Sequence, residues 1–306
     1  MPEGDTVHKV AAVIRKEIDG EILTRCLLRG IYGSERLAGA RVLEVEALGK
    51  HLLVHLDRDI QVRVHLGMRG SWHRYPVGAP WKRSANNAGV VFETARSVLV
   101  CFDPMEIEAI PTPQRHWHRQ LENLGPDLLA EGEPEWEAVL ARCKELHPRE
   151  DFLGEILLDQ RVAAGIGNVY KSELAFMGPL EGDAFAFSSK GYSPWTPWAE
   201  LPKDELVRLF QRARILLQAN LGGWYRTTTT DRRINPASKD GDLYVYGRVE
   251  EECRRCGGDI ARGHQGLQNR VTYWCPACQP GPVPTLLPAK GQPESGKAGR
   301  PAPRRR

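Results

Sequence analysis

The sequence contains no apolar run that approaches the roughly 18 residues of a transmembrane helix. Its first residues, Met1-Pro2-Glu3-Gly4-Asp5, lack the apolar stretch of a secretory signal peptide. We therefore expect a cytoplasmic protein that has no membrane partner. At 306 residues, with 41% hydrophobic and 26% charged residues, the chain has the composition of a globular protein of two or three domains.

The sequence also lacks a large excess of one charge, since its formal net charge is only +3. That surplus lies in residues 281–306, where six basic residues stand against a single acidic residue, Glu294. Residues 1–280 are therefore slightly acidic, and they can bind a polyanion only if their cations gather on one face. The last segment is rich in Pro, Gly and Arg and cannot bury a core, so we predict a disordered basic tail over residues 281–306.

Cysteine is scarce outside one cluster. Four of the seven cysteines form two Cys-x2-Cys pairs separated by 18 residues: Cys253, Cys256, Cys275 and Cys278. Each pair lets one tight turn supply two thiolates, which is the spacing of a tetrahedral zinc site. Closed four-thiolate sites hold folds together and rarely do chemistry, so we predict one structural Zn2+. The remaining cysteines show no pairing pattern, and we expect them to be buried or incidental in a reducing cytosol: Cys26, Cys101 and Cys143.

The first third of the chain combines one helix with several strands. Residues 6–18 have apolar positions at helical spacing, and Thr6 is placed to cap that helix. Five later runs alternate with period two between Gly, Pro, Asp and Asn, which is typical of short antiparallel strands in a sandwich or barrel. They are residues 41–47, 51–56, 60–66, 89–93 and 97–102.

Beyond about residue 115 the apolar period becomes helical. The predicted helices are residues 135–146, 152–160, 169–177 and 204–220. Residues 178–198 have the composition of an extended surface loop, and a zinc hairpin is expected over residues 248–280.

A glycine-rich turn, residues 161–168, enters the helix over 169–177. Backbone amides at a helix start, together with the Asn168 side chain, can form an anion site. The turn is not a Walker loop, because the Gly-Lys-Ser/Thr ending is absent. Taken alone, it is explained equally well as a connector between two helices.

Three residues near the start of the chain are suited to chemistry on a sugar. The initiator methionine is normally removed before proline, which would leave Pro2 with a free secondary amine that titrates at about pH 8. Such an amine can attack a sugar C1′ atom and form an iminium, while Glu3 can act as an acid at the ring oxygen. Lys50, in a glycine-lysine turn, can reach a phosphate or donate a proton. The alternative for Lys50 is an ordinary solvated turn lysine.

Together these stretches resemble one family, the bacterial formamidopyrimidine-DNA glycosylase/endonuclease VIII proteins, nearer to the endonuclease VIII branch. The matching blocks follow family order, and the glycine-turn and zinc blocks are each highly specific. They are Pro2-Glu3-Gly4-Asp5-Thr6-Val7, Gly49-Lys50-His51-Leu52-Leu53, and residues 65–72, 124–127, 157–173, 244–248 and 270–279.

The resemblance implies an α+β fold, with an N-terminal helix plus antiparallel β-sandwich, a helix–two-turns–helix domain and a C-terminal zinc β-hairpin. The expected divisions are a catalytic sandwich domain over 1–115, a linker over 116–130, a helix–two-turns–helix DNA-binding domain over 131–247, a zinc finger over 248–280 and the tail over 281–306. Damaged DNA would lie between the two halves with its lesion flipped out of the stack. A monomer acting on the bacterial nucleoid is expected.

The resemblance also implies the catalytic residues. Pro2 would be the nucleophile, and Glu3 would be the acid that opens the ribose ring. The resulting Schiff base permits β- and then δ-elimination, which cuts the strand on both sides. Lys50 matches a lysine that contacts phosphate and assists proton transfer, and Arg270 matches a residue with a part in δ-elimination.

Five residues are expected to contact DNA. Asn168 and Arg270 match residues that clamp phosphates beside the lesion, and Lys171 belongs to the same block as Asn168. Met68, with Arg69, falls where the family places a wedge that fills the vacated space.

The chain departs from the family pattern at four places. Thr6 stands where a second glutamate is usual and Asp5 replaces a proline, so an auxiliary carboxylate is missing or shifted. Asp103-Pro104 is followed by Met105-Glu106-Ile107 instead of Arg-Arg-Phe, so an intercalating arginine is missing. Asn123 stands where an arginine is often found just before Leu-Gly-Pro-Asp, and Arg115 or Arg119 are candidates to substitute for it. Residues 179–192 resemble an insertion. The missing arginine favours oxidised pyrimidines or abasic sites over 8-oxoguanine opposite cytosine.

The sequence therefore predicts a bifunctional DNA glycosylase/abasic-site lyase that excises oxidised pyrimidines in base excision repair. One alternative is mainly an abasic-site lyase with weak base excision. Another is a non-catalytic damaged-DNA-binding relative that keeps only the binding modules. The joint presence of Pro2, Glu3 and Lys50 argues against this second alternative, because a binding protein has no use for a free N-terminal proline.

Overall fold

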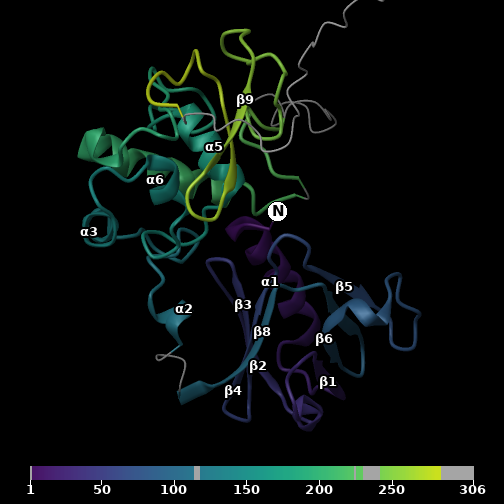
Figure 1. Cartoon of the computed structure of the whole chain (residues 1–306). Coiled ribbons are helices and arrows are strands. Elements are labelled where there is room, and N and C mark those ends of the chain that lie inside the picture. Colours follow the sequence, from purple (N-terminus) through teal and green to yellow (C-terminus); the bar gives the residue numbers. More distant parts are fainter. Residues whose placement is uncertain (1, 114–117, 224, 230–241, 284–306) are drawn as a thin grey trace, which may run out of the picture.

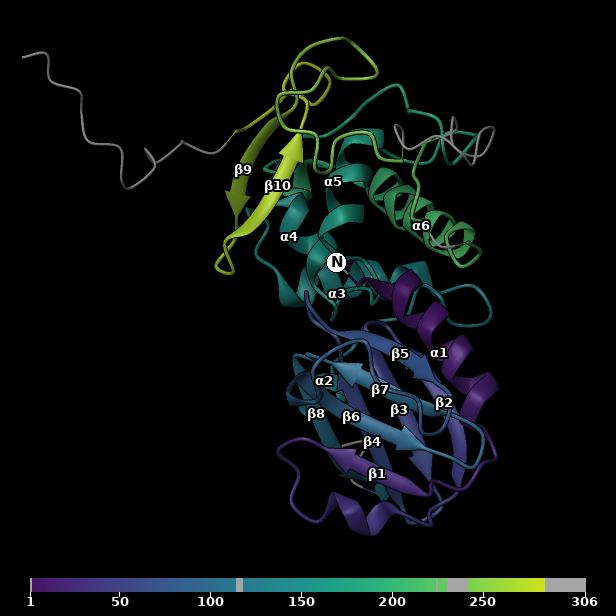
Figure 2. The same cartoon turned by 90° about the vertical axis from the view of Figure 1, so that its right-hand side faces the viewer.

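The computed structural model of the chain describes residues 2–113, 118–223, 225–229 and 242–283. They form two lobes, and α1 begins at the junction between them in both views (Figures 1 and 2). The predicted tail lies almost entirely outside the described residues, and so does Arg115. Of the helices in this described part of the chain, none combines the length and the apolarity needed to cross a membrane.

The first lobe is a sandwich of two four-stranded antiparallel sheets, ordered β1-β6-β7-β5 and β2-β3-β4-β8. The strands are β1 Arg25–Leu28, β2 Val42–Leu48, β3 His51–Leu56, β4 Ile60–His65, β5 Ser71–Tyr75, β6 Ala88–Glu93, β7 Val98–Phe102 and β8 Glu106–Pro111. The five predicted strands are confirmed as β2, β3, β4, β6 and β7. The other three were missed because β1 has only four residues and β5 and β8 are mostly half-buried, which removes the clear alternation.

The core of this lobe lies between the two sheets, where apolar side chains such as Val54 and Leu99 meet. Helix α1 (Gly4–Ile18) covers it with a buried face made of Val7, Ala11, Ile14 and Ile18. The helix begins two residues earlier than predicted, and Thr6 does not cap it. Glu3 occupies the N-cap position, and the Thr6 hydroxyl instead accepts a hydrogen bond from Arg226 at 3.0 Å.

The second lobe is helical and has its own core. Its elements are α3 Trp136–Leu146, α4 Leu153–Leu158, α5 Asn168–Met177, a 3-10 turn Trp198–Glu200 and α6 Lys203–Ala219. The short helix α2, Arg119–Glu122, precedes them and packs Leu121 against Leu53 and Ile110 of the first lobe. The four predicted helices agree with α3 to α6 within two residues at each end. Helix α5 lies at the centre, and every one of its residues is buried. The three cysteines outside the cluster are buried as predicted, and burial raises the pKa of Cys26 and of Cys143 to about 12.

The prediction of an extended surface loop over residues 178–198 is wrong. Tyr192 and Trp195 are at most 5% exposed, and the Phe187 ring packs on Tyr244 with 4.6 Å between centroids. The Tyr192 amide also donates to the carbonyl of Ala175 in α5 at 2.8 Å. Aromatic side chains bury large areas, so this irregular segment completes the helical core instead of lying over it.

The last described element is a two-stranded antiparallel hairpin, β9 (Ala261–Gln265) and β10 (Arg270–Trp274), which falls within the predicted hairpin region. Figure 2 shows β10 beside α5 in the second lobe. Helix α5 therefore contacts both β10, near the end of the described chain, and Glu3, near its start.

Candidate active site and metal centre

Glu3 connects the two lobes. It precedes α1 and is fully buried, yet its carboxylate faces the start of α5. One oxygen, Oε1, accepts a hydrogen bond from the Val169 amide at 2.8 Å, and Oε2 accepts from the amides of Gly167 at 3.0 Å and Tyr170 at 3.4 Å. The first amides of a helix have no partner within it and carry partial positive charge, so they bind a carboxylate well. The glycine turn is therefore an anion site, and the anion it holds is Glu3 itself.

Glycine is required where the N-terminal segment meets this turn. The Gly4 amide donates to the Gly165 carbonyl at 2.9 Å, and a Cβ atom on Gly4 would lie 2.8 Å from the Cα atom of Gly165. A Cβ atom on Gly167 would lie 2.3 Å from the Glu3 side chain. Gln160 also holds the turn, since its Oε1 accepts a hydrogen bond from the Gly165 amide at 3.1 Å. Pro2, which is half-buried, thus takes its position from the docking of Glu3.

The turn between β2 and β3 is seated against the same glycine turn. Gly49 has a φ of +57°, which favours glycine, and a Cβ atom there would lie 2.9 Å from the Cβ atom of Ala164. The Gly49 amide donates to Asp127 Oδ2 at 2.7 Å, and His8 lies 3.3 Å from the same oxygen. Asp127 therefore ties the linker region to both α1 and the turn that carries Lys50.

Lys50 is not an isolated surface lysine. It is half-buried, and burial lowers the pKa of its ammonium to about 8, against the opposing charge of Glu3. The positive charges of Arg270 and Arg226 lower the same pKa further. Lys50 and Arg270, which lie 220 positions apart in the sequence, are thus close enough to repel each other beside Glu3.

Polar side chains of α5 fasten β10 in place. Asn168 Nδ2 donates to the Val271 carbonyl at 2.6 Å, and Lys171 Nζ donates to Thr272 Oγ1 at 2.6 Å. Lys171 is fully buried, and burial, with a contribution from Arg270, lowers its pKa to about 7. This position argues against the predicted direct contact between Lys171 and DNA, because the ammonium lies beneath the hairpin.

Arg270 begins β10 and remains half-buried. Its Nε and Nη2 donate to Gln268 Oε1 at 2.9 and 2.7 Å, which holds the guanidinium beside the hairpin turn. Of the predicted catalytic residues, the structure thus brings Glu3, Lys50 and Arg270 to one junction, with Pro2 adjoining Glu3.

Met68 and Arg69 lie at the exposed turn between β4 and β5, where Met68 is 70% exposed. A second exposed methionine, Met105, lies against this turn: a Cβ atom on Gly67 would be 2.6 Å from its Cβ. The Met105 amide donates to the His65 carbonyl at 2.9 Å. Met105 was not predicted as a site residue, and the only sequence signal was its place in the departure from Arg-Arg-Phe.

Asp5 and Arg226 were also missed. Asp5 is fully buried in the first turn of α1, and Arg226 lies in the segment that follows α6. Arg226 Nε donates to Asp5 Oδ2 at 3.1 Å, while Nη1 lies 3.8 Å from Glu3 Oε1. No local pattern marks Arg226, since its neighbours are mostly threonines.

The four clustered cysteines fit a tetrahedral metal ion. Their four Sγ atoms all lie within 4.8 Å of one another, and those of Cys253 and Cys278 are 3.8 Å apart. Cys256 and Cys275 are 3.5 Å apart. Four sulfurs at about 2.3 Å from one zinc ion would be separated by about 3.8 Å, so the donor set and its spacing match.

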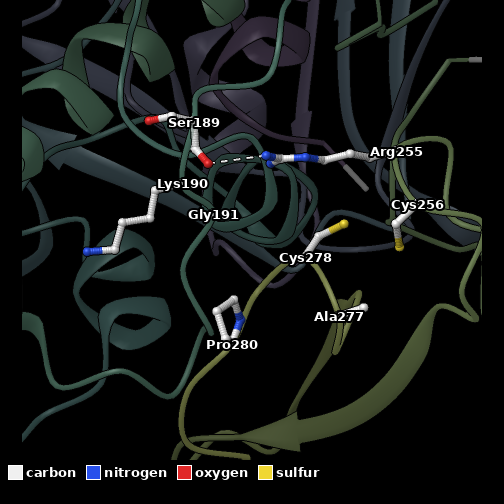
Figure 3. Close-up of a pocket in the computed structure, with 8 residues that line it drawn as sticks. All are labelled: Ser189, Lys190, Gly191, Arg255, Cys256, Ala277, Cys278 and Pro280. Atoms are coloured by element: carbon white, nitrogen blue, oxygen red, sulfur yellow. Dashed lines mark hydrogen bonds between the residues drawn. The ribbon is translucent and has the colours of Figure 1, made fainter.

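An open hollow of about 350 Å³ lies beside this cluster (Figure 3). Its walls come from the cysteine turns and from residues 189–191, and the Ser189 carbonyl accepts a hydrogen bond from Arg255 at 3.2 Å. None of the predicted catalytic residues lines it. The hollow therefore belongs to the metal centre and its neighbouring loop, and the junction at Glu3 is a separate site.

Comparison with known proteins identifies the relatives of this chain. Residues 1–122 match the family model described as the formamidopyrimidine-DNA glycosylase N-terminal domain. The chain is similar to the probable endonuclease 8 2 of Streptomyces coelicolor, with 39% identity over 290 residues that cover 93% of this chain and 96% of that protein. It is equally similar to a DNA-(apurinic or apyrimidinic site) lyase of Mycolicibacterium smegmatis, with 39% identity over 280 residues that cover 91% and 99%.

Solved structures share the fold. The formamidopyrimidine-DNA glycosylase of Lactococcus lactis, bound to DNA containing an abasic site, superposes with a TM-score of 0.70 at 22% identity and covers 91% of this chain and 100% of its own. The Thermus thermophilus protein gives 0.69 at 25% identity, with 92% and 100% covered. The predicted α+β fold is confirmed.

We expect the purified protein to contain one zinc ion per chain, since four thiolates can close one tetrahedral site. Cys253→Ser or Cys275→Ser should lower the zinc content well below one and loosen the hairpin, because both side chains are buried in the cluster. Metal analysis and thermal unfolding would test this. Cys143→Ser is the matched control for a buried cysteine outside the cluster, and a zinc content that fell equally in this control would contradict the assignment.

Proposed function

The chain belongs to the formamidopyrimidine-DNA glycosylase/endonuclease VIII family, and we propose that it is a bifunctional DNA glycosylase and abasic-site lyase of base excision repair. The observation that carries the proposal is the set of hydrogen bonds between α5 and Glu3, the residue next to Pro2, at a junction where Glu3, Lys50 and Arg270 act on one another electrostatically. We propose damaged DNA on the bacterial nucleoid as the partner, and a cytoplasmic monomer as the active form.

The proposed chemistry begins at Pro2. After removal of Met1, the secondary amine attacks C1′ of the damaged nucleotide, the base leaves, and an iminium joins the nitrogen to C1′. Glu3, which is held as a carboxylate, takes the proton that the Pro2 nitrogen loses on attack and delivers it to the ring oxygen as the sugar opens. The base leaves with the electron pair of its bond to C1′ and takes a proton from water. Loss of the 3′-phosphate and then of the 5′-phosphate follows by β- and δ-elimination, and water releases Pro2.

Lys50 and Arg270 supply the positive charge for these steps. Cations beside the junction stabilise the phosphates that flank the opened sugar, and Arg270 assists the second elimination. Asn168, whose Nδ2 donates to Val271, is proposed to meet a phosphate at the same helix start. For Lys171 we propose a supporting role, because its buried ammonium holds β10 and thereby Arg270.

The exposed methionines are suited to hold the DNA open. We propose that Met68, with Arg69 beside it, enters the space left by the flipped nucleotide, and that Met105 fills the remainder. Two apolar side chains do not offer the hydrogen bonds that an intercalating arginine offers to an opposite base. This difference supports oxidised pyrimidines as the preferred lesions.

For the metal centre we propose a single Zn2+ held by Cys253, Cys256, Cys275 and Cys278. The ion would close the end of the hairpin and has no proposed part in the reaction. The hairpin supported in this way carries Arg270 at the start of β10.

A second candidate function is an abasic-site lyase with weak base excision, which the name of the Mycolicibacterium smegmatis relative favours. Rates on thymine glycol, dihydrouracil, 8-oxoguanine and abasic sites, each in single- and double-stranded DNA, distinguish the two. A damaged-DNA-binding protein without catalysis is less well supported, because Pro2, Glu3 and Lys50 occur together at one junction.

The proposal predicts a covalent adduct at Pro2. Borohydride should trap the wild-type protein on abasic-site DNA, and mass spectrometry should locate the adduct on the N-terminal peptide. A chain with residues added before Pro2 should not be trapped, because the amine becomes an amide, and Pro2→Gly should be trapped far less. Lys203→Ala removes an exposed amine and should change nothing. Full trapping of the extended chain would refute the proposed nucleophile.

The low pKa of Lys50 predicts pH-dependent binding. A phosphate partner raises the pKa of the bound ammonium above its free value of about 8, so affinity is highest below pH 8 and falls as the pH rises above it. We expect the Kd for an uncleavable abasic analogue to rise by up to about tenfold per pH unit over that range. Lys50→Arg keeps its positive charge over this pH range, so the Kd of this variant should not change with pH. An equal rise of Kd with pH in this variant would exclude Lys50 as the source of the pH dependence.

Arg270→Ala should lose strand cleavage by about a hundredfold, because the cation beside the junction is gone. Its zinc content should remain that of the wild type, since Arg270 does not contact the cysteines. Arg262→Ala, an exposed arginine on β9, is the matched control and should keep both properties. Loss of zinc together with cleavage would make Arg270 a residue of the fold instead.

A further inference from the structure

We propose that Asp5 and Arg226 form a buried ion pair that positions Glu3, and through it Pro2, for catalysis. This inference rests on the proposed function and adds two positioning residues to it. Neither side chain needs to touch the DNA in order to act. Their effect would pass through the direction in which the Glu3 carboxylate is held.

The two residues form a forked contact. Arg226 Nε donates to Asp5 Oδ2 at 3.1 Å and Nη2 donates to Oδ1 at 2.5 Å, so two N–H groups meet two oxygens. Asp5 is fully buried and the Arg226 side chain is 13% exposed. Forked arginine–carboxylate pairs are among the strongest and most directional contacts in proteins. The geometry therefore fixes the orientation of the guanidinium as well as its place.

The same guanidinium faces Glu3. Its third nitrogen, Nη1, lies 3.8 Å from Glu3 Oε1, the oxygen that also accepts from the Val169 amide. Burial acts to lower the pKa of Arg226, but the charges of Glu3 and Asp5 raise it well above the usual range. Arg226 therefore stays charged, and it is shared between two buried carboxylates.

The backbone that carries Arg226 is anchored independently. The side chain of Asn220, at the end of α6, donates to the Thr227 carbonyl and accepts from the Thr227 amide, both at 2.8 Å. The Arg226 guanidinium also lies over the ring of Tyr170 in α5, 5.0 Å from its centroid. Asp5 is thus paired with a cation whose own position is set by α5 and α6.

This pair explains the departure at positions 5 and 6. Thr6 offers Arg226 only a neutral hydroxyl, at 3.0 Å from Nη2, whereas Asp5 supplies the charge. The auxiliary carboxylate expected at position 6 is therefore shifted by one residue instead of missing. The neighbouring cation, Lys9 Nζ, lies 3.8 Å from Asp5 Oδ2 but does not reach Glu3 within the contacts of the described residues.

A positioning role makes a specific prediction about rates. The amides of α5 already supply hydrogen bonds to both Glu3 oxygens. The contribution of Arg226 is therefore to fix the orientation of the carboxylate. Loss of the pair should let the carboxylate turn and should slow the chemical step. Binding of DNA should change little, because neither side chain is placed among the predicted phosphate contacts.

The test compares Arg226→Gln, Arg226→Lys and the double variant Asp5→Asn/Arg226→Gln in the full-length protein. The double variant replaces the ion pair with a neutral hydrogen-bonding pair, so it should melt closer to the wild type than Arg226→Gln does. Its single-turnover rate on thymine-glycol DNA should fall by about tenfold to a hundredfold. Its Kd for an uncleavable abasic analogue should stay within about threefold of the wild type. The control Glu17→Gln/Arg74→Gln removes the ion pair between α1 and β5 and should leave both values unchanged.

A folded double variant with the wild-type rate would overturn the proposal and leave the function of Pro2 intact. If weaker DNA binding by the double variant accounted for its whole loss of rate, the proposal would be overturned as well. If the double variant does not fold, Arg226→Lys decides: it keeps the charge without the fork, so we expect an intermediate rate, and a wild-type rate would refute positioning by the fork. Failure of the wild type itself to form the borohydride adduct would instead refute the proposed function.

Discussion

The hydrogen bonds between the Glu3 carboxylate and the first amides of α5 are the contact on which the rest of this structure depends. A buried carboxylate needs donors, and the start of a buried helix has donors without acceptors, so each group meets the requirement of the other. The contact joins the two lobes and sets where Pro2 lies. It also explains the glycines of the turn, since a side chain on Gly167 would occupy the space of the carboxylate.

Around this contact the protein gathers positive charge that its composition does not reveal. Lys50, Lys171, Arg226 and Arg270 come from four separate parts of the chain, while residues 1–280 as a whole are slightly acidic. Their mutual repulsion is tolerated because Glu3 and Asp5 lie among them and because α5 holds β10 by direct hydrogen bonds. Asp5 and Glu3 offset Arg226, and Lys171 is buried beneath the hairpin, so Lys50 and Arg270 are the two of these cations that suit the junction to a polyanion.

Sequence alone predicted what depends on local periodicity and spacing: the strands β2, β3, β4, β6 and β7, the helices α3 to α6, and the cysteine cluster. It failed where side chains from distant positions decide the outcome. The sequence predicts a surface loop over residues 178–198, because an irregular aromatic segment does not show which core it fills. The sequence places Lys171 among the DNA contacts, because nothing near it in the sequence shows that β10 covers its ammonium. The pair of Asp5 and Arg226 spans 221 positions, and no local pattern encodes such a contact.

The separation between Glu3 and Val169, 166 positions along the chain, has a consequence during synthesis. Pro2 leaves the ribosome well before the glycine turn and the hairpin with Arg270. Because domains generally fold as units in the order of their synthesis, the first lobe can close while its Glu3 carboxylate still faces water. A partial chain would then carry the proposed nucleophile, Pro2, without the helix that holds Glu3. Under the proposed function, strand cutting would therefore need the finished molecule, in which α5 and Arg270 are both in place.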